Sequence, residues 1–429
     1  MNSRSQFREI TLRSRSAAFA PVAPELRLPK FFGCNLDAKK ILCALRVTII
    51  GLGSVGGRVA AHLARFQVAS LHLVDPKAFK PESLLTHEMS PADVGKSKAM
   101  QVARRCKRIS PRTRVFAFIG GVADLALSDL ARMSLVVLAT DDLAPEVDAG
   151  WKCANVGKAL IQGSVHGETL CAQVRVFGNA SAQSPCPACI YNEMEWRLLY
   201  ERAKFSCQGG PVPSSEFQVP SSTSPSSKLE TRNPEPGTAP PTMSHSALCA
   251  LAADLVLNQV LRAALKLGEP VEDTLLEYCG YTNRIVTSRL VRNPKCPVDH
   301  SIFELAFAPR ELAECSLAEL ATTAGAQPSD PSLGFTIEGF VWANKLVCQC
   351  PTLRSVQRFV KSGRKEIGRC SKCNSPLQVQ PFYSLRTVPM QTLGESAAVP
   401  LGKLGTHGAR SVLVQTAERG VRLCNPIAE

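Results

Sequence analysis

One stretch decides the fold: Arg46-Val-Thr-Ile-Ile-Gly-Leu-Gly-Ser-Val-Gly-Gly57. Its first half is apolar and β-branched, which predicts a buried strand, and it runs directly into the spaced glycines Gly51, Gly53 and Gly56. Apolar residues then recur every three or four positions up to Ala64, as in a helix that covers a core. Glycines allow a tight turn, and the N–H groups and dipole of a helix start favour phosphate oxygens. The stretch therefore predicts a nucleotide site, without naming the nucleotide or the reaction.

Strand-like and helix-like patterns alternate after this stretch. Helical patterns cover residues 96–108 and 145–156, and apolar strand patterns cover residues 70–75, 114–119, 134–139, 159–162 and 170–177. Repeated strand–helix units with short loops predict an α/β protein with a doubly wound, mostly parallel sheet. Ligands bind such sheets at the carboxyl ends of the strands. Gly51, Asp75 and Asp141 all fall at these ends, so we expect them to share one site.

The composition narrows the class of protein. The chain has 429 residues, is 45% hydrophobic and carries a net charge of +14. A basic surface suits an acidic partner, but nucleic acid is disfavoured because no basic patch is interleaved with aromatic residues. No apolar run reaches the roughly 18 residues of a membrane span. Several of the 17 cysteines pair as Cys-x-x-Cys and no secretory signal precedes them, which predicts a reducing compartment, the cytoplasm, rather than disulfides.

Composition also divides the chain into three regions. Residues 1–24 are basic and rich in serine, which fits a disordered tail better than a transit peptide. Residues 25–300 hold the strand–helix pattern, interrupted at 208–242 by a Ser/Pro-rich tract with too few apolar residues to order itself. A long apolar helix follows, with Ser244 as its expected N-cap. Residues 301–429 form a different region with cysteines of its own.

The first set of candidate zinc ligands joins two distant segments. Cys186 and Cys189 form a Cys-x-x-Cys half-site, and a tetrahedral zinc needs a second pair from elsewhere. The segment that begins at Cys296 offers it, with either Asp299 or His300 as the fourth ligand. The usual spacing points to Asp299, whereas the imidazole of His300 is the better zinc ligand, so we predict Cys296 and His300. Reduced structural thiols remain the alternative.

A second set of candidate zinc ligands lies in the C-terminal region. It consists of Cys348, Cys350, Cys370 and Cys373, two cysteine pairs that bracket about twenty residues. Four cysteines at this spacing predict a closed, structural zinc site, because the cysteine-rich shell leaves no open position for a reacting water. The C-terminal region is therefore predicted to bind zinc, with reduced thiols again as the alternative.

One cysteine stands apart from both sets. Cys207 lies in Ser206-Cys-Gln-Gly-Gly210, immediately before the Ser/Pro-rich tract. A cysteine on a loop is accessible, as a nucleophile must be, although an incidental loop cysteine would look the same. No base lies beside it in the sequence, which matters less if the acyl group that it attacks is already activated. Cys207 is therefore a candidate nucleophile.

The order of these motifs resembles the ubiquitin-activating-enzyme superfamily, which includes the ThiF and MoeB adenylyltransferases. The resemblance covers about residues 27–300 and rests on the glycine loop, Asp75, the segment 95–98, Asp141, the Cys-x-x-Cys pair, an isolated cysteine before a flexible loop, a long helix and a second zinc half-site. It implies a Rossmann-like ThiF adenylation fold and adenylation of the C-terminal glycine of a ubiquitin-like or sulfur-carrier protein. The C-terminal region is similar to the tails of bacterial activating enzymes of ubiquitin-like conjugation, which are linked to antiviral defence.

The resemblance implies a nucleotide-binding set made of Gly51, Gly53, Gly56, Asp75, Ser83, Lys98 and Asp141. In these implied roles Asp75 bonds the ribose, Lys98 meets phosphate charge as pyrophosphate leaves, and Asp141 holds Mg²⁺. The implied cofactors are ATP, Mg²⁺ and Zn²⁺.

The resemblance also implies which proteins would receive the activated glycine, and in which order. Cys207 would take the activated glycine as a thioester, beneath a crossover loop formed by residues 208–242, and pass it to a conjugating enzyme. The zinc-binding tail would dock that enzyme. A homodimer is expected, in which Arg27 or Lys30 reaches across to the partner's site.

The chain departs from the family pattern at two cations. Thr86 and Glu146 stand where the resemblance implies arginines that contact phosphates, which would weaken ATP binding or transition-state stabilisation. His87 and Lys96 are candidates to compensate. Two alternatives therefore stay open beside the activating enzyme: a sulfur-carrier adenylyltransferase and a catalytically weakened partner subunit. A nicotinamide dehydrogenase would explain the glycine loop but none of the motifs that follow it.

Overall fold

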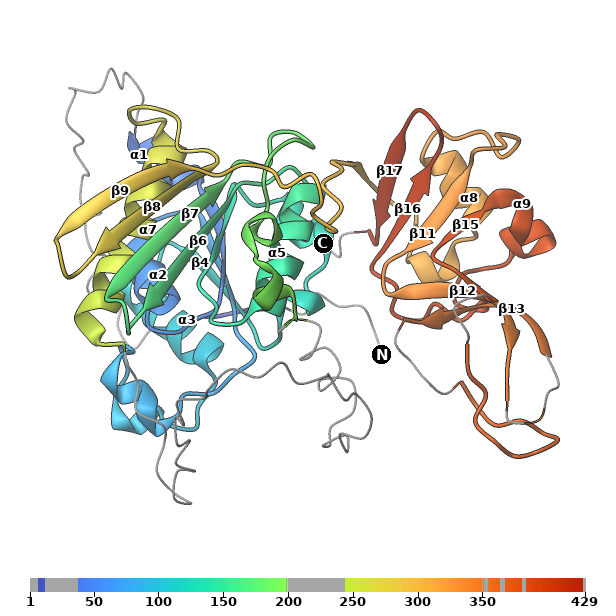
Figure 1. Ribbon diagram of the computed structural model, residues 1–429, viewed down its shortest axis with the longest axis horizontal. Helices are drawn as coiled ribbons and strands as arrows, with labels where there is room; N and C mark the ends of the chain where they lie inside the picture. Colours follow the sequence, from blue (N-terminus) through green and yellow to red (C-terminus); the bar gives the residue numbers. More distant parts are fainter. Residues whose placement is uncertain are drawn as a thin grey trace, which may run out of the picture.

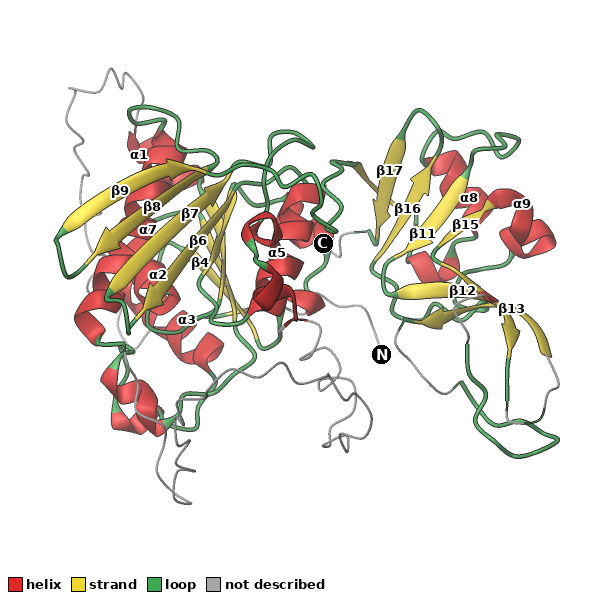
Figure 2. Ribbon diagram, viewed as in Figure 1, coloured by secondary structure: helices red, strands yellow, loops and turns green. Residues whose placement is uncertain are grey.

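The computed structural model describes residues 7–11, 38–197, 199, 244–348, 350, 354–362, 367–379 and 383–426 (Figures 1 and 2). Its helices are α1 (Ala38–Ala44), α2 (Gly56–Arg65), α3 (Lys98–Ile109), α4 (Leu127–Ala131), α5 (Leu143–Asn155), α7 (Ser246–Leu265), α8 (Leu317–Thr323) and α9 (Met390–Leu393). The strands of the larger sheet are β1 (Arg8–Glu9), β2 (Arg46–Ile50), β3 (Ser70–Val74), β4 (Arg114–Phe118), β5 (Leu135–Leu138), β6 (Leu160–His166), β7 (Cys171–Phe177), β8 (Thr274–Cys279) and β9 (Arg284–Arg289).

These nine strands form one mixed sheet in the order β1-β4-β3-β2-β5-β6-β7-β8-β9. The five strands from β4 to β6 are parallel, which confirms the predicted doubly wound sheet. From β7 onward the neighbours are antiparallel. The sequence analysis missed β8, because its residues are all partly buried and show no alternation between a buried and an exposed face.

Helices cover both faces of this sheet. α2, α3 and α7 lie on one face, and α5 lies on the other, toward the C-terminal region (Figure 1). Strands covered in this way must be apolar on both sides, and the last four residues of β2 are indeed all buried. The packing of α7 is close: a Cβ added at Gly163 of β6 would lie 2.4 Å from Cγ2 of Val256.

The long helix α7 corrects two expectations. Its N-cap is His245 and not Ser244, since Nδ1 of His245 accepts a hydrogen bond from the N–H of Leu248 at 3.2 Å. In the part of the chain that the structure describes, α7 is also the one helix long and apolar enough to cross a membrane, so the expectation that no segment qualifies is wrong. Half of its most apolar window is buried in the protein, where it contacts β6, β7 and α2.

Residues from 304 onward form two smaller sheets with a separate core. One sheet has the order β10-β17-β16-β11-β15 and the other the order β13-β12-β14. Their strands are β10 (Glu304–Phe307), β11 (Gly334–Ile337), β12 (Phe340–Leu346), β13 (Arg354–Lys361), β14 (Ser384–Leu385), β15 (Thr387–Pro389), β16 (Ser411–Gln415) and β17 (Gly420–Cys424). The core is anchored by Trp342, which is fully buried and meets the ring of Phe359 edge-on at a centroid distance of 4.8 Å.

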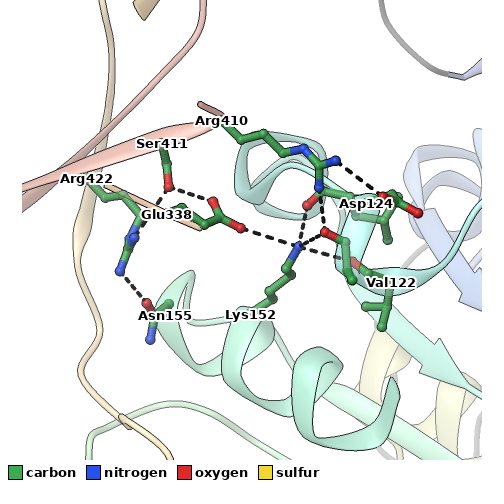
Figure 3. A network of polar contacts seen from close by, with 10 residues as sticks. Val122, Asp124, Lys152, Asn155, Glu338, Arg410, Ser411 and Arg422 are labelled. Carbon is green, nitrogen blue, oxygen red and sulfur yellow. Dashed lines mark hydrogen bonds and ion pairs between the residues drawn. The ribbon is translucent and has the colours of Figure 1, made fainter. Parts of the chain in front are cut away.

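A buried ion pair joins these sheets to the nine-stranded part (Figure 3). Lys152 of α5 is 2% exposed, and its Nζ lies 3.6 Å from Oε1 of Glu338, in the turn between β11 and β12. Ser411 donates a hydrogen bond to the other carboxylate oxygen of Glu338 at 2.8 Å. The ammonium also donates to three backbone carbonyl oxygens, those of Val122, Ala123 and Leu125. A charge so buried is tolerated only because it is paired and hydrogen-bonded in this way.

Two further contacts surround this pair. Arg422 of β17 donates to Oδ1 of Asn155 at 2.8 Å, and its guanidinium lies 5.6 Å from the ring centroid of Trp151. Arg410 pairs with Asp124 at 3.4 Å (Figure 3). The last turns of α5 therefore hold the C-terminal region, while the first turn of the same helix follows directly on the strand end at β5.

Candidate functional site

Two positions of the glycine loop after β2, Gly51 and Gly56, require glycine. Gly51 has φ +85°, and a Cβ there would lie 2.5 Å from the carbonyl oxygen of Ala139. A Cβ at Gly56 would lie 1.9 Å from the carbonyl oxygen of Gly51. The loop thus packs against the end of β5 and begins α2 directly behind it, which confirms the predicted strand, turn and helix.

Asp75 fastens this loop to the end of β3. The carboxylate is 4% exposed, and its two oxygens accept hydrogen bonds from the N–H groups of Leu52 and Lys77, each at 2.7 Å. Each oxygen keeps a second lone pair that a ribose hydroxyl could use. Asp75 therefore holds the glycine loop in place through the N–H of Leu52, and the same carboxylate could also bind a ribose.

Asp141 and two lysines lie together at the strand ends. Nζ of Lys77 is 3.5 Å from Oδ1 of Asp141. Burial alone would raise the pKa of Asp141, but Lys77 and then Lys98 outweigh it and hold that pKa below its usual value. Burial lowers the pKa of Lys98, an effect that the Asp75 carboxylate opposes. The structure thus places Asp75 and Asp141 after the ends of β3 and β5, with Lys98, which the resemblance implied, close to both, and it adds Lys77, which sequence reasoning missed.

His87 lies between Lys98 and the glycine loop. Its Nε2 is 3.2 Å from Nζ of Lys98, and a Cβ at Gly53 would lie 3.4 Å from the same nitrogen. Thr86 contacts the other ring nitrogen, Nδ1, through its hydroxyl at 2.9 Å. Burial, followed by the charge of Lys98, lowers the pKa of His87 to about 4, so the imidazole is neutral at physiological pH.

Other predicted residues have local roles in the structure. The hydroxyl of Ser83 is buried and accepts a hydrogen bond from the N–H of Lys80 at 3.2 Å, which caps the 3₁₀ helix η2 (Pro81–Leu85). Lys96 is exposed on the turn before α3. Glu146, where an arginine was implied, is buried and accepts a hydrogen bond from the hydroxyl of Tyr191 at 2.8 Å. Burial raises the pKa of Glu146, and the residue ties α5 to the segment that carries the first cysteine pair.

The first four candidate zinc ligands meet in one buried cluster. The ligand atoms of Cys186, Cys189, Cys296 and His300 all lie within 4.8 Å of one another. Sγ of Cys186 is 3.9 Å from Sγ of Cys189 and from Sγ of Cys296, close to the roughly 3.8 Å that Zn–S bonds of about 2.3 Å give in a tetrahedron. The donor set, three thiols and one imidazole, suits zinc.

The geometry selects His300 rather than Asp299 for this cluster. Nε2 of His300 lies 3.6 Å from Sγ of Cys189, whereas Oδ1 of Asp299 accepts a hydrogen bond from the N–H of Ser301 at 2.9 Å. Nδ1 of His300 is 2.9 Å from the carbonyl oxygen of Ser184. A carbonyl only accepts, so Nδ1 carries the proton and Nε2 keeps the lone pair that a metal needs.

The second cysteine set also forms one cluster. The sulfurs of Cys348, Cys350, Cys370 and Cys373 lie within 4.8 Å of one another, with Cys350 and Cys370 at 3.8 Å. Lys372 donates its N–H to Sγ of Cys370 at 3.4 Å, a contact that favours a thiolate. This cluster could hold a zinc ion as well. The predicted nucleophile Cys207, the tract 208–242, and Arg27 and Lys30 lie outside the described residues.

Comparison with known proteins identifies the family of the nine-stranded region. A model of the ThiF family matches residues 24–298, about two thirds of the chain and the part that carries the nine-stranded sheet. This chain belongs to the ThiF family. Members of this family are adenylyltransferases that use ATP and act on a ubiquitin-like or sulfur-carrier protein, and this chain carries the corresponding region.

Individual ThiF-family relatives are distant. The chain is 25% identical over 261 residues to the sulfur carrier protein adenylyltransferase of Thermus thermophilus, covering 59% of this chain and 81% of that protein. It is 22% identical over 268 residues to the molybdopterin-synthase adenylyltransferase of Salmonella typhimurium, covering 62% and 91%. A crystal structure of E. coli MccB with ATP is similar at a TM-score of 0.44 and 16% identity, covering 61% of this chain and 68% of that one.

Proposed function

We propose that this ThiF-family protein activates the C-terminal glycine of a ubiquitin-like protein and passes it on as a thioester. The observation that carries the proposal is the convergence of Asp75, Lys98 and Asp141 beside the glycine loop. An acid at the end of β3 suits the ribose, a lysine suits phosphate charge, and the aspartate after the end of β5 suits Mg²⁺.

The proposed chemistry has two steps. The glycine carboxylate attacks the α-phosphorus of ATP and pyrophosphate leaves, while Lys98 stabilises the charge that develops. Asp141 would hold Mg²⁺, whose charge would offset the repulsion among the phosphates. The thiolate of Cys207 then attacks the acyl carbon and AMP leaves, so the free energy of the activated bond is retained in a thioester.

The C-terminal region favours conjugation over sulfur transfer in this proposal. The matched relatives align with about 60% of the chain, and the sheets from β10 to β17 lie beyond the ThiF match. We propose that residues 301–429 are a zinc-binding unit that docks the conjugating enzyme, and that both cysteine clusters hold structural zinc. A reducing compartment such as the cytoplasm suits the fifteen described cysteines, none of which forms a disulfide.

A non-reducing gel tests the proposal. The purified protein is mixed with ATP, Mg²⁺ and a ubiquitin-like protein encoded by a neighbouring gene, and ATP–pyrophosphate exchange is measured in parallel. We expect a thiol-sensitive adduct that disappears in Cys207→Ala. The matched control is Cys43→Ala, which removes an exposed free cysteine from the same region and should leave the adduct intact.

The other outcomes identify the alternatives. Pyrophosphate exchange without an adduct supports a sulfur-carrier adenylyltransferase and rejects thioester transfer. Neither activity, with binding of the ubiquitin-like protein intact, supports a catalytically weakened partner subunit. An adduct that survives Cys207→Ala would show that another cysteine is the nucleophile.

A further inference from the structure

Among the residues that the structure describes, few cations at the candidate nucleotide site are available for a triphosphate. Thr86 and Glu146, at the positions where arginines were implied, contact His87 and Tyr191 instead. Arg58 in the first turn of α2 is already paired with Glu88 at 3.2 Å. A nucleotide triphosphate carries several negative charges, so a further cation among the described residues would strengthen its binding beyond Lys98 and Mg²⁺.

Lys77 has the position that such a cation requires. Its N–H is held by Asp75 at 2.7 Å, and its carbonyl oxygen accepts the N–H of Lys98 at 3.1 Å. The backbone is thus fixed between the end of β3 and the start of α3. The side chain is 59% exposed, so its ammonium is free to move, and in this structure it lies 3.5 Å from the carboxylate of Asp141.

His87 holds the second ammonium without adding charge. A lysine ammonium can only donate, so Nε2 of His87 accepts from Lys98 and the ring proton sits on Nδ1, which donates to Thr86. Nε2 of His87 itself lies beside Gly53, since a Cβ there would be 3.4 Å from it, so Nζ of Lys98 is held 3.2 Å from an atom that borders the glycine loop. His87 is therefore a positioning residue, and Lys77 is the additional charge.

We propose that Lys77 binds a phosphate of the nucleotide, and that its ammonium leaves Asp141 for a phosphate oxygen when a divalent cation takes the Asp141 carboxylate. The inference rests on the proposed function, because it assumes that this site binds Mg²⁺ and a nucleotide. In the absence of both, Lys77 neutralises the carboxylate that the metal would otherwise neutralise. Lys77 thus contacts Asp141 when the site holds no metal or nucleotide, and a phosphate oxygen when it holds both.

Two binding measurements on Lys77→Met test this exchange. The affinity for ATP, measured by calorimetry with Mg²⁺ present, should fall about ten- to a hundredfold, as expected for one lost charge-assisted contact. The affinity for Mn²⁺ alone, followed by its paramagnetic resonance signal, should rise, because the competing ammonium is gone. Lys80→Met is the matched control: Lys80 lies on the same segment, pairs with Glu82 at 3.6 Å, and should change neither affinity.

Lys98→Met separates this inference from the proposed function. If Lys98→Met loses ATP affinity and Lys77→Met does not, Lys77 is not a phosphate ligand. If neither variant loses affinity, the nucleotide site itself is misassigned. Weaker ATP binding by Lys77→Met with unchanged Mn²⁺ binding would contradict the exchange at Asp141. Circular dichroism of each variant checks that the fold is intact.

Discussion

Glu338→Gln is expected to lower the free energy of unfolding by about 3 kcal/mol or more, because it leaves the ammonium of Lys152 buried without its carboxylate. The side chains of Lys152 and Glu338 are only 3% and 15% exposed, so water screens the pair little. The substitution keeps the shape and the acceptor for Ser411, and removes only the charge. Urea denaturation at pH 7 measures the loss.

The pH dependence of this loss has a defined sign. Burial lowers the pKa of Lys152 in the folded protein, and Glu338 opposes that shift. Without Glu338 the folded pKa falls further below that of the unfolded chain, so the unfolded state binds more protons and stability rises with pH. The deficit of Glu338→Gln should therefore shrink as the pH is raised toward the usual lysine pKa.

A control in the same sheet shows whether the effect belongs to the ion pair. Glu418 is exposed in the turn between β16 and β17, and Glu418→Gln should change stability by less than about 0.5 kcal/mol. A loss below about 1 kcal/mol in Glu338→Gln would contradict the interpretation that Lys152 depends on this carboxylate.

If both clusters hold zinc as proposed, Cys296→Ser is expected to remove one of the two ions per chain and to destabilise the ThiF-family part by several kcal/mol. Zinc contributes roughly 10 to 16 kcal/mol to the folding of small metal domains, and a larger domain should lose part of that. Cys296 brings the segment after β9 to the pair that follows β7, so losing the metal detaches two distant segments. Metal content by mass spectrometry and the thermal unfolding midpoint measure both effects.

Two further variants decide the fourth ligand of this cluster. His300→Ala should lose the same zinc ion, whereas Asp299→Asn should keep both ions, because Asp299 accepts a hydrogen bond from the N–H of Ser301 and is not one of the four clustered ligands. Cys43→Ser, at an exposed cysteine outside both clusters, should also keep both. A full complement of zinc in Cys296→Ser would show that this cluster does not bind the metal.

The nucleotide loop and the parallel sheet could be predicted because their signals are local. The apolar run before Gly51 and the periodicity after Gly56 lie within one strand–turn–helix unit. Acids at successive strand ends meet because parallel strands share an edge, which is a property of the topology and not of any single contact. The same local signals missed β8 and placed the N-cap of α7 one residue too early.

Contacts between distant segments could not be predicted in this way. Sequence spacing left Asp299 and His300 open as zinc ligands, and the fold selected His300 through its distance to Cys189. Glu146 stands where the resemblance implies an arginine, and only the structure shows that its carboxylate accepts a hydrogen bond from Tyr191.

The sequence alone showed a glycine loop, strand-end acids and two cysteine sets, all recognised by residue type and spacing, and the family resemblance added Lys98 at the start of α3. Only the tertiary structure decided how these groups are used. Lys77 faces Asp141, His87 holds Lys98, and Glu338 neutralises Lys152 across 186 positions of chain, measured from residue 152 to residue 338. The physical reason is that charge pairing depends on distance in space, which the spacing of residues along the chain does not specify.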